Sequence, residues 1–355
     1  MRGGWARLAT LIAAGVAWSA QGRADVPALG VVEAQRLVVH DTAGPLPVSP
    51  DGSPTGQALA KLLYEPTNFE VEVQPAPPVD RAMGGPDAYV RFSSPVNTGD
   101  AQLDRVTARW HRAKGVDLSK PTPMVVLAHS LQPQLFVGSA MARGLADRGV
   151  HVLLVELPGF ASRQPQGVRF PVTATFGRIP QAAADLRRAR DVAAALPGID
   201  PGRVGLAGVS LGGLFATLAG GYDGAFARIE LVCTGADVNR VLAEGRKDAD
   251  FAGRALRSAG WTEAQIQAAT TEMDPTRLAP RLDPGRTRVF AAADDQVFST
   301  ERVAALTGAA GLPEGAVVWI AGNHYTMARA MPAVLDAIAA GAREAEPVTP
   351  SPAPR

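Results

Sequence analysis

The sequence predicts an α/β fold in which a mostly parallel sheet carries helices on both faces. Short, almost entirely apolar runs such as 124–128 (MVVLA) and 151–157 (HVLLVEL) have the composition of strands that are buried on both sides. Longer segments with helical spacing of their apolar residues, such as 181–196, lie between these runs. Buried strands that alternate with helices are typical of parallel sheets with crossover helices.

The composition excludes several classes of function. Of the 355 residues, 46% are apolar and 19% are charged, as in an ordinary globular protein with a sizeable core. The formal net charge is +1 and there is no long run of Lys or Arg, which argues against a nucleic-acid partner. The length suits one large α/β domain or two smaller ones.

Residues 1–24 have the features of an export signal. Arg2 and Arg7 form a basic start, and 8–20 form an apolar core that is short for a bilayer span. A small-x-small pattern ends at Ala24, so we expect cleavage after this residue. The mature protein is then expected to be periplasmic or secreted, without stable membrane insertion. An uncleaved anchor is the alternative.

The remaining chain divides into an extension, a main domain and a tail. Clustered prolines in 25–87 break regular structure, so we expect an N-terminal extension on the domain surface, with a short helix at 56–63 and a strand at 69–73. Residues 88–342 contain the alternation of strands and helices and form the predicted main domain. Closely spaced prolines indicate a disordered tail over 343–355.

The main domain contains further elements in chain order. Strands are expected at 89–92, 103–110, 203–209, 228–233, 287–292 and 316–320, and helices at 139–148, 301–306 and 327–340. No helix separates the first two of these strands, so they are expected to form an antiparallel edge of the sheet. The region of about 237–283 interrupts the alternation with helix-like segments, which predicts a helical cap over the strand ends.

The segment 203–222 (RVGLAGVSLGGLFATLAGGY) changes from a strand pattern to a helix pattern at Ser210. Such a sharp turn strains the backbone, and a Cβ at Gly208 or Gly212 would strike the neighbouring strand or helix. The G-x-S-x-G pattern in this context is typical of a nucleophile elbow, in which the N–H of Leu211 is free to bind an oxyanion. The alternative is a glycine-rich turn whose serine only caps the helix.

A serine nucleophile needs a base, and histidine suits this role because it titrates close to working pH. The candidates are the five histidines of the chain: His40, His111, His129, His151 and His324. His324 is favoured because it follows the strand at 316–320, at the sheet edge where ligands bind in open α/β folds. Asp294 and Asp295 follow the strand at 287–292, and either can orient the base.

The order Ser–Asp–His, with each residue placed after a strand, resembles the α/β-hydrolase superfamily over roughly 88–340. The resemblance is to its esterase and dienelactone-hydrolase-like branches. It extends to the run ELPG at 156–159 and to DP at 274–275. It implies an α/β-hydrolase fold, with a mostly parallel central sheet, helices on both faces and a helical cap insertion.

The same resemblance implies a catalytic triad of Ser210, Asp295 and His324. The run 295–298 (DQVF) looks like the D-x-V-V run of the family, and this favours Asp295 over Asp294. Asp295 would hold the histidine in the tautomer that accepts the serine proton.

The resemblance also implies an oxyanion hole. The loop at 129–133 (HSLQP) is similar to the H-G-x loop of the family, which would make the N–H of Leu131 a second oxyanion donor beside that of Leu211. The sequence departs from the family at Ser130, where a glycine normally allows close approach of the backbone. His129 is expected to brace this loop rather than to take part in the chemistry.

These observations predict an exported serine hydrolase that cleaves a carboxylic ester of a small molecule through an acyl-enzyme. A peptidase or acyltransferase of the same fold, or a non-catalytic binding protein built on it, are the alternatives.

No cofactor or metal is expected, because no cluster of His, Asp and Glu has ligand spacing. The one cysteine, Cys233, is expected to be a buried structural thiol. Phe251, Trp261 and Met273 are candidates to line a pocket under the cap or to pack its core. The acyl and alcohol groups and the oligomeric state stay open.

Overall fold

The computed structural model describes residues 32–44, 51–117, 119–132, 134–165, 167 and 171–348. The predicted signal at 1–24 lies outside the described residues, and so does the predicted tail from 349 onward. Among the described helices, none is both long and apolar enough to cross a lipid bilayer.

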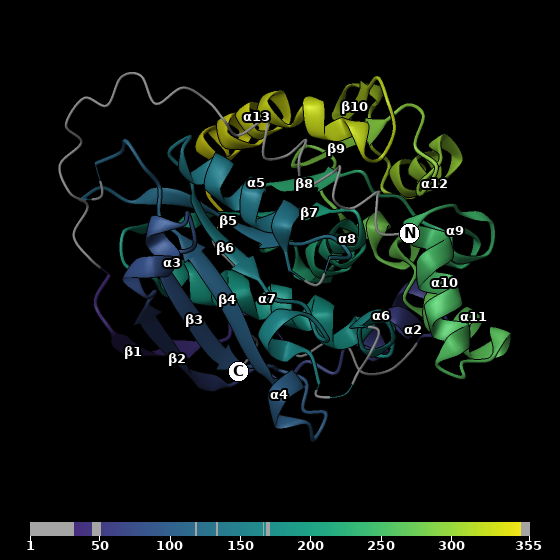
Figure 1. Cartoon of the computed structure of the whole chain (residues 1–355), viewed down its shortest axis with the longest axis horizontal. Coiled ribbons are helices and arrows are strands. Elements are labelled where there is room, and N and C mark those ends of the chain that lie inside the picture. Colours follow the sequence, from purple (N-terminus) through teal and green to yellow (C-terminus); the bar gives the residue numbers. More distant parts are fainter. Residues whose placement is uncertain are drawn as a thin grey trace.

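The structure confirms the predicted α/β architecture, with a mixed, mostly parallel sheet between helices (Figure 1). The strands lie in the order β1-β2-β3-β4-β6-β5-β7-β8-β9-β10. From β6 to β10 neighbouring strands are parallel, and from β1 to β6 they pair antiparallel. The bounds are β1 Gln35–His40, β2 Asn68–Pro75, β3 Ala88–Ser93, β4 Arg105–His111, β5 Thr122–Ala128, β6 His151–Val155, β7 Ile199–Val209, β8 Ile229–Val232, β9 Thr287–Ala292 and β10 Val317–Ile320.

Helices cover both faces of the sheet. The α-helices are α2 Pro54–Ala60, α3 Pro78–Ala82, α4 Ala101–Asp104, α5 Phe136–Ala146, α6 Pro171–Phe176, α7 Ile179–Ala195, α8 Leu211–Asp223, α9 Val238–Glu244, α10 Asp248–Ser258, α11 Glu263–Glu272, α12 Thr300–Ala309 and α13 Met331–Glu344. Short 3-10 turns are η1 Ala161–Arg163, η2 Pro275–Arg277, η3 Ala279–Arg281, η4 Glu314–Ala316 and η5 Thr326–Arg329. Residues of α7 and α8 pack into one hydrophobic core, and residues of α5 and α13 pack into another.

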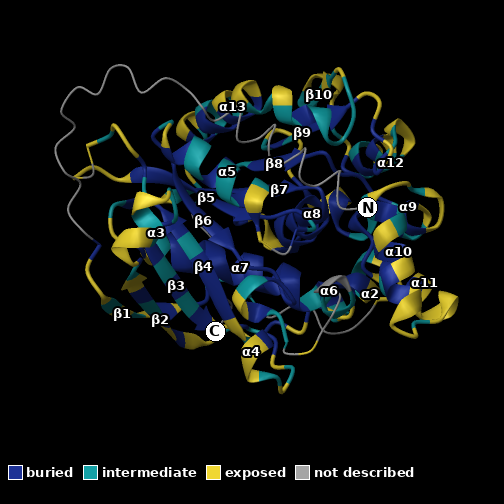
Figure 2. Ribbon diagram, viewed as in Figure 1, coloured by how far each residue is buried: buried dark blue, intermediate teal, exposed yellow. Residues whose placement is uncertain are grey.

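The central strand β5 shows why its sequence is continuously apolar. Met124, Val126 and Ala128 face the core that contains α7 and α8. Val125 and Leu127 face the core that contains α5 and α13. Because successive side chains point to opposite faces and both faces are covered, every position is buried (Figure 2).

The N-terminal part of the chain differs from the expectation of an extension on the domain surface. β2 pairs antiparallel with β3, and β1 pairs with β2, so this region adds two strands to the central sheet. The predicted boundary at residue 88 therefore falls at the start of β3, inside one continuous sheet. The predicted strand at 103–110 also begins later, because α4 occupies its first residues. The strands β3 and β4 are antiparallel as predicted, although the edge strand is β1.

The segment predicted as a helical cap, about 237–283, consists of α9, α10 and α11 followed by η2 and η3. The three helices form a group beside the main body of the sheet (Figure 1). α9 packs against α10 and α11, and α10 contacts α6. α11 begins with a capping box in which Thr262 and Gln265 satisfy each other's backbone N–H groups.

Buried ion pairs attach the N-terminal strands to α7. The Nε and Nη2 atoms of Arg188 donate hydrogen bonds to the carboxylate of Asp41, at 3.0 and 2.5 Å. The side chains of Arg188 and Asp41 are both buried. Tyr64 donates a hydrogen bond to the same carboxylate at 2.5 Å. Thr42 donates two hydrogen bonds to Asp191, at 2.8 Å and 2.7 Å. A buried carboxylate is stable only with such partners, so this network fixes the N-terminal segment on α7.

Replacement of Arg188 by Met is expected to lower the free energy of unfolding by about 3–5 kcal/mol, because Asp41 then stays buried without its cation. Urea denaturation followed by circular dichroism measures this loss. The matched control is Arg254→Met in α10, whose ion pair with Asp250 is solvent-exposed and should change stability by only about 0.5 kcal/mol. Equal stability of the two variants would show that the buried pair does not hold the N-terminal segment.

Candidate active site

Ser210 lies between the end of β7 and the start of α8, in a strained conformation with φ 55° and ψ −118°. A Cβ at Gly208 would lie 2.4 Å from the carbonyl oxygen of Gly212, and one at Gly212 would lie 2.2 Å from that of Ala128. Only glycine allows strand, turn and helix to approach so closely. The sequence argument about these two positions is therefore confirmed.

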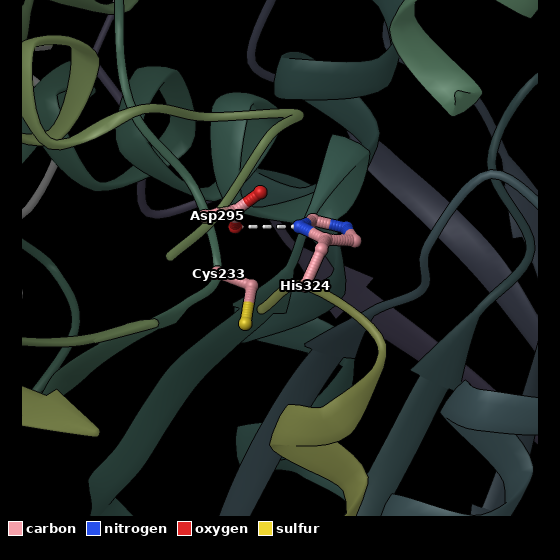
Figure 3. Close-up of side chains that lie close together, drawn as sticks. All are labelled: Cys233, Asp295 and His324. Carbon is pink, nitrogen blue, oxygen red and sulfur yellow. Dashed lines mark hydrogen bonds and ion pairs between the residues drawn. The ribbon is translucent and has the colours of Figure 1, made fainter. Parts of the chain in front are cut away.

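The imidazole of His324 lies between Ser210 and Asp295. Its Nε2 is 3.0 Å from the Oγ of Ser210, and its Nδ1 is 2.7 Å from Oδ2 of Asp295 (Figure 3 draws the second bond). His324 follows β10 and precedes η5, and Asp295 follows β9. The three side chains predicted as a triad are thus brought together although they come from separate loops.

Asp295 is the carboxylate that meets the histidine. Its Oδ1 accepts hydrogen bonds from the backbone N–H groups of Val297 at 2.7 Å and Phe298 at 3.1 Å, so its Oδ2 is directed to His324. Asp294 is exposed, and its backbone N–H donates to the carbonyl of Gly322. The geometry therefore favours Asp295 over Asp294.

These partners assign the histidine tautomer. An ionised carboxylate only accepts hydrogen bonds, so Nδ1 of His324 carries the proton that faces Asp295. In the neutral ring Nε2 then has a free lone pair and accepts the hydroxyl proton of Ser210. This is the orientation in which an imidazole can act as a general base toward a serine.

The two predicted oxyanion donors lie on either side of the elbow. Leu211 is the first residue of α8, so its N–H has no acceptor within the helix. Leu131 lies at the centre of a tight turn in which the N–H of Gln132 donates to the carbonyl of Ser130 at 2.7 Å. Within the described residues, the N–H groups of Leu131 and Leu211 donate to no acceptor. Both are therefore open to a ligand.

His129 braces this loop. Its Nε2 accepts a hydrogen bond from the N–H of Leu157 at 3.1 Å, and its Nδ1 lies 2.8 Å from the carbonyl oxygen of Ser130. Burial lowers the pKa of His129 to about 4, so the ring is neutral at neutral pH. The hydroxyl of Ser130, at the position where the resemblance implies a glycine, is buried and has no hydrogen-bond partner among the described residues.

An apolar cavity lies beside the elbow, beneath the cap. Its wall includes Leu211 and Leu214 of α8, Phe176 of α6 and Met273 at the end of α11. Met273 is buried in the larger hydrophobic core and also lines this small cavity, so it fits both sequence interpretations. Trp261 packs against the larger hydrophobic core, and the side chain of Phe251 is exposed.

Cys233 lies unexpectedly close to the acid and the base. It follows β8, and its Sγ and the nearest ligand atoms of Asp295 and His324 all lie within 4.8 Å of one another. Burial and the charge of Asp295 raise the pKa of its thiol, so it is protonated at neutral pH. Figure 3 shows its sulfur directed away from the His324–Asp295 bond. A cation here would have to displace that bond, so the three groups fit a metal poorly.

The sequence analysis did not include two other residues near the base. Tyr325 follows His324, and their rings meet edge to face with centroids 5.6 Å apart. Burial and then the charge of Asp248, the first residue of α10, raise the pKa of the Tyr325 phenol. Tyr325 could have been found from the sequence because it directly follows the expected base. Nothing in the sequence around Asp248 indicates that it belongs near the site.

Comparisons with known proteins bear on the fold. Neither a protein-family model nor a curated protein sequence matches the chain. Solved structures do match. The α/β hydrolase GrgF from Penicillium sp. sh18 aligns with a TM-score of 0.53 at 14% identity, over 72% of this chain and 98% of that one. An acetyl xylan esterase from Paenibacillus sp. R4 aligns with a TM-score of 0.52 at 15% identity, over 94% and 92% of the two chains.

The similarity to both structures spans most of their length, although few residues are identical. At such low sequence identity, the similarity shows only that the chains have the same fold. Together with the strand order and the turn at Ser210, it shows that the chain has the fold of the α/β-hydrolase superfamily.

Proposed function

We propose that this protein is an exported serine hydrolase that cleaves a carboxylic ester of a small molecule through an acyl-enzyme intermediate. The observation that carries the proposal is the continuous path from Ser210 Oγ to His324 Nε2 at 3.0 Å and from His324 Nδ1 to Asp295 at 2.7 Å. Both distances allow proton transfer without movement of the chain.

In this mechanism His324 removes the hydroxyl proton as Ser210 attacks the ester carbonyl. The negative charge that develops on the carbonyl oxygen is stabilised by the N–H groups of Leu211 and Leu131, each typically worth about 3 kcal/mol. Asp295 stabilises the imidazolium. The imidazolium then protonates the leaving alcohol, which leaves the acyl group on Ser210. Water, activated by the same imidazole, releases the acid and restores the serine.

The fold supports this proposal without defining the substrate. One structural neighbour is described as an acetyl xylan esterase, but the low identity limits that comparison to the fold. The cavity beside Leu211 has an apolar wall but a volume of only about 10 Å³, so an acyl group could enter it only if the cap side chains moved apart. A panel of p-nitrophenyl esters, peptide p-nitroanilides and acceptor alcohols separates an esterase from a peptidase and from an acyltransferase.

Ser210→Ala is expected to reduce turnover of p-nitrophenyl acetate by at least about 10³-fold, because the nucleophile is lost. The variant should also lose covalent labelling by a fluorophosphonate probe and keep its circular dichroism spectrum. Ser119→Ala, at an exposed turn, is the control and should retain both activities. Labelling of Ser210→Ala at the wild-type rate would reject the assignment of the nucleophile.

Replacing Asp295 or Asp294 by asparagine is expected to have very different effects on kcat. Asp295→Asn should lower kcat by about 10³–10⁴-fold, because an amide at this position no longer holds the required histidine tautomer. Asp294→Asn should stay within about twofold of wild type, since its side chain is exposed. Steady-state kinetics on one ester measures both effects. A larger loss in the Asp294 variant would reverse the assignment.

The proposed export is tested by the N-terminus of the mature protein. Full-length chain produced in a Gram-negative host should appear in the periplasmic fraction and begin at Asp25, because the signal pattern ends at Ala24. N-terminal sequencing of that fraction makes the measurement, with a chain starting at Asp25 as the cytoplasmic control. Recovery of uncleaved protein in the membrane fraction would instead indicate a retained anchor.

A further inference from the structure

One buried carboxylate joins the two ends of the cap. Asp274 lies between α11 and η2, where the chain leaves the cap, and its side chain is buried. Its Oδ2 accepts a hydrogen bond from the backbone N–H of Val238 at 2.8 Å. Val238 is the first residue of α9, where the chain enters the cap. This hydrogen bond therefore connects two residues that are 36 positions apart in the sequence.

The exit side of this connection is fixed on the main domain. Oδ1 of Asp274 accepts hydrogen bonds from the N–H of Thr276 at 3.0 Å and from its hydroxyl at 2.7 Å. Further along the chain, Arg281 donates to the carbonyl groups of Gly221 and Tyr222 in α8, at 2.7 and 2.8 Å. Asp274 therefore extends toward α9 from a segment that is bound to the main domain.

The entry side depends on contacts of this kind. As the first residue of α9, Val238 has an N–H group without an acceptor inside the helix. Asp237, directly before it, has φ 57° and ψ 55°, a left-handed conformation that is uncommon for a residue with a Cβ. Such a backbone persists where surrounding contacts impose it. Arg302 of α12 forms an ion pair with Asp237, and Asp274 binds the next residue, so these two side chains hold the entry turn.

The residues that Asp274 holds form part of the cavity beside the elbow. Val238 binds its carboxylate, Met273 and Pro275 are its chain neighbours, and all three line the cavity. Leu211, which carries a proposed oxyanion N–H, lines the same cavity. The volume of about 10 Å³ has room for about one water molecule. The positions of Val238, Met273 and Pro275 therefore limit how much of an acyl chain can lie beside the elbow.

We propose that Asp274 is a specificity-determining residue, which restricts the acyl group of the ester to short chains by holding the cap against α8. A short acyl group needs little of this cavity, whereas a long chain requires Val238 and Met273 to move away from Leu211. The hydrogen bonds of Asp274 oppose that movement. The proposal rests on the proposed function, in which Ser210 is acylated, and adds the class of substrate: esters of short-chain carboxylic acids.

Other contacts hold the rest of the cap. The backbone N–H of Arg246 donates to the carbonyl of Gln296 at 3.1 Å, and Lys61 forms an exposed ion pair with Glu272 of α11 at 3.0 Å. Both contacts remain when the Asp274 carboxylate is changed. Loss of this carboxylate is therefore expected to loosen the entry of the cap without detaching the cap from the main domain.

The test compares Asp274→Asn with Asp283→Asn, an exposed acid that also accepts a backbone N–H in a turn. Wild type and both variants are assayed with p-nitrophenyl acetate, butyrate, hexanoate and octanoate, and wild type should prefer acetate. Asp274→Asn should raise the hexanoate-to-acetate ratio of kcat/KM about tenfold, the scale of burying two more methylene groups. The rise should come mainly from a lower KM for hexanoate. Asp283→Asn should keep the wild-type ratio.

Three further variants separate specificity from folding. Met273→Ala enlarges the cavity without changing the carboxylate, so it should raise the same ratio. Thr276→Val removes one of the three donors to Asp274 and should raise the ratio by a smaller factor, which keeps the test decisive where Asp274→Asn does not fold. Arg188→Met, which is expected to lower stability through another ion pair, should leave the ratio unchanged.

Hydrogen–deuterium exchange tests the cap without an assay of activity. Peptides that contain the start of α9 should exchange faster in Asp274→Asn than in Asp283→Asn, because the N–H of Val238 has lost its buried acceptor. Equal exchange in the two variants would overturn the proposal.

The kinetic outcomes distinguish this inference from the proposed function. A wild-type protein that prefers hexanoate to acetate would overturn the role of Asp274 while remaining a hydrolase. So would an unchanged ratio in Asp274→Asn, or in Thr276→Val where Asp274→Asn does not fold, whatever Met273→Ala does. A wild-type protein that hydrolyses none of the esters and does not react with the fluorophosphonate probe would reject the proposed function itself, and this inference with it.

Discussion

The close approach of β5, β7 and α8 at the Ser210 turn is the constraint on which the site depends. Gly212 rests against the carbonyl groups at the end of β5, with no room for a Cβ. The helix can therefore start directly behind the serine, which aims its first N–H group at the position of the hydroxyl. Any side chain at Gly212 would separate the two strands from the helix and move the proposed nucleophile, Ser210, away from the proposed oxyanion donors.

The sheet brings the other groups to this point because parallel strands end at a common edge. Along that edge β5, β7, β8, β9 and β10 are consecutive. The proposed oxyanion loop follows β5 on one side of Ser210, and Asp295 and His324 follow β9 and β10 on the other. His324 thus extends back across two strands to reach Ser210, and its contact with Asp295 on the way fixes its direction. The order of the strands, more than any local motif, brings Ser210, Asp295 and His324 together.

The sequence predicted those parts of the site that carry a local signal. Ser210, Asp295 and His324 each follow a recognisable apolar strand, and the G-x-S-x-G spacing reflects sterics within a few residues. Contacts between distant segments had no such signal. β1 was assigned to an irregular extension because clustered prolines surround it, and no local pattern indicated that Arg188 of α7 is buried in an ion pair with Asp41. Cys233, Asp248 and Tyr325 matter only through neighbours that the tertiary structure supplies.

Seven described residues other than glycine have a positive φ. Five of them are Leu135 after the proposed oxyanion loop, Ser210 at the elbow, Cys233 and Asp237 after β8, and Lys247 in the turn between α9 and α10; the other two are Leu63 and Ala161. Each such residue costs free energy that packing must offset. The turn at residues 245–248 contacts Gln296 through the N–H of Arg246 and the Tyr325 ring through Lys247, so contacts of this strained turn also reach the loops of Asp295 and His324. A cap that moved away from the sheet would lose these contacts to Gln296 and Tyr325, the chain neighbours of Asp295 and His324. Cap and candidate site are therefore joined through the backbone of the two loops that bring Asp295 and His324 together.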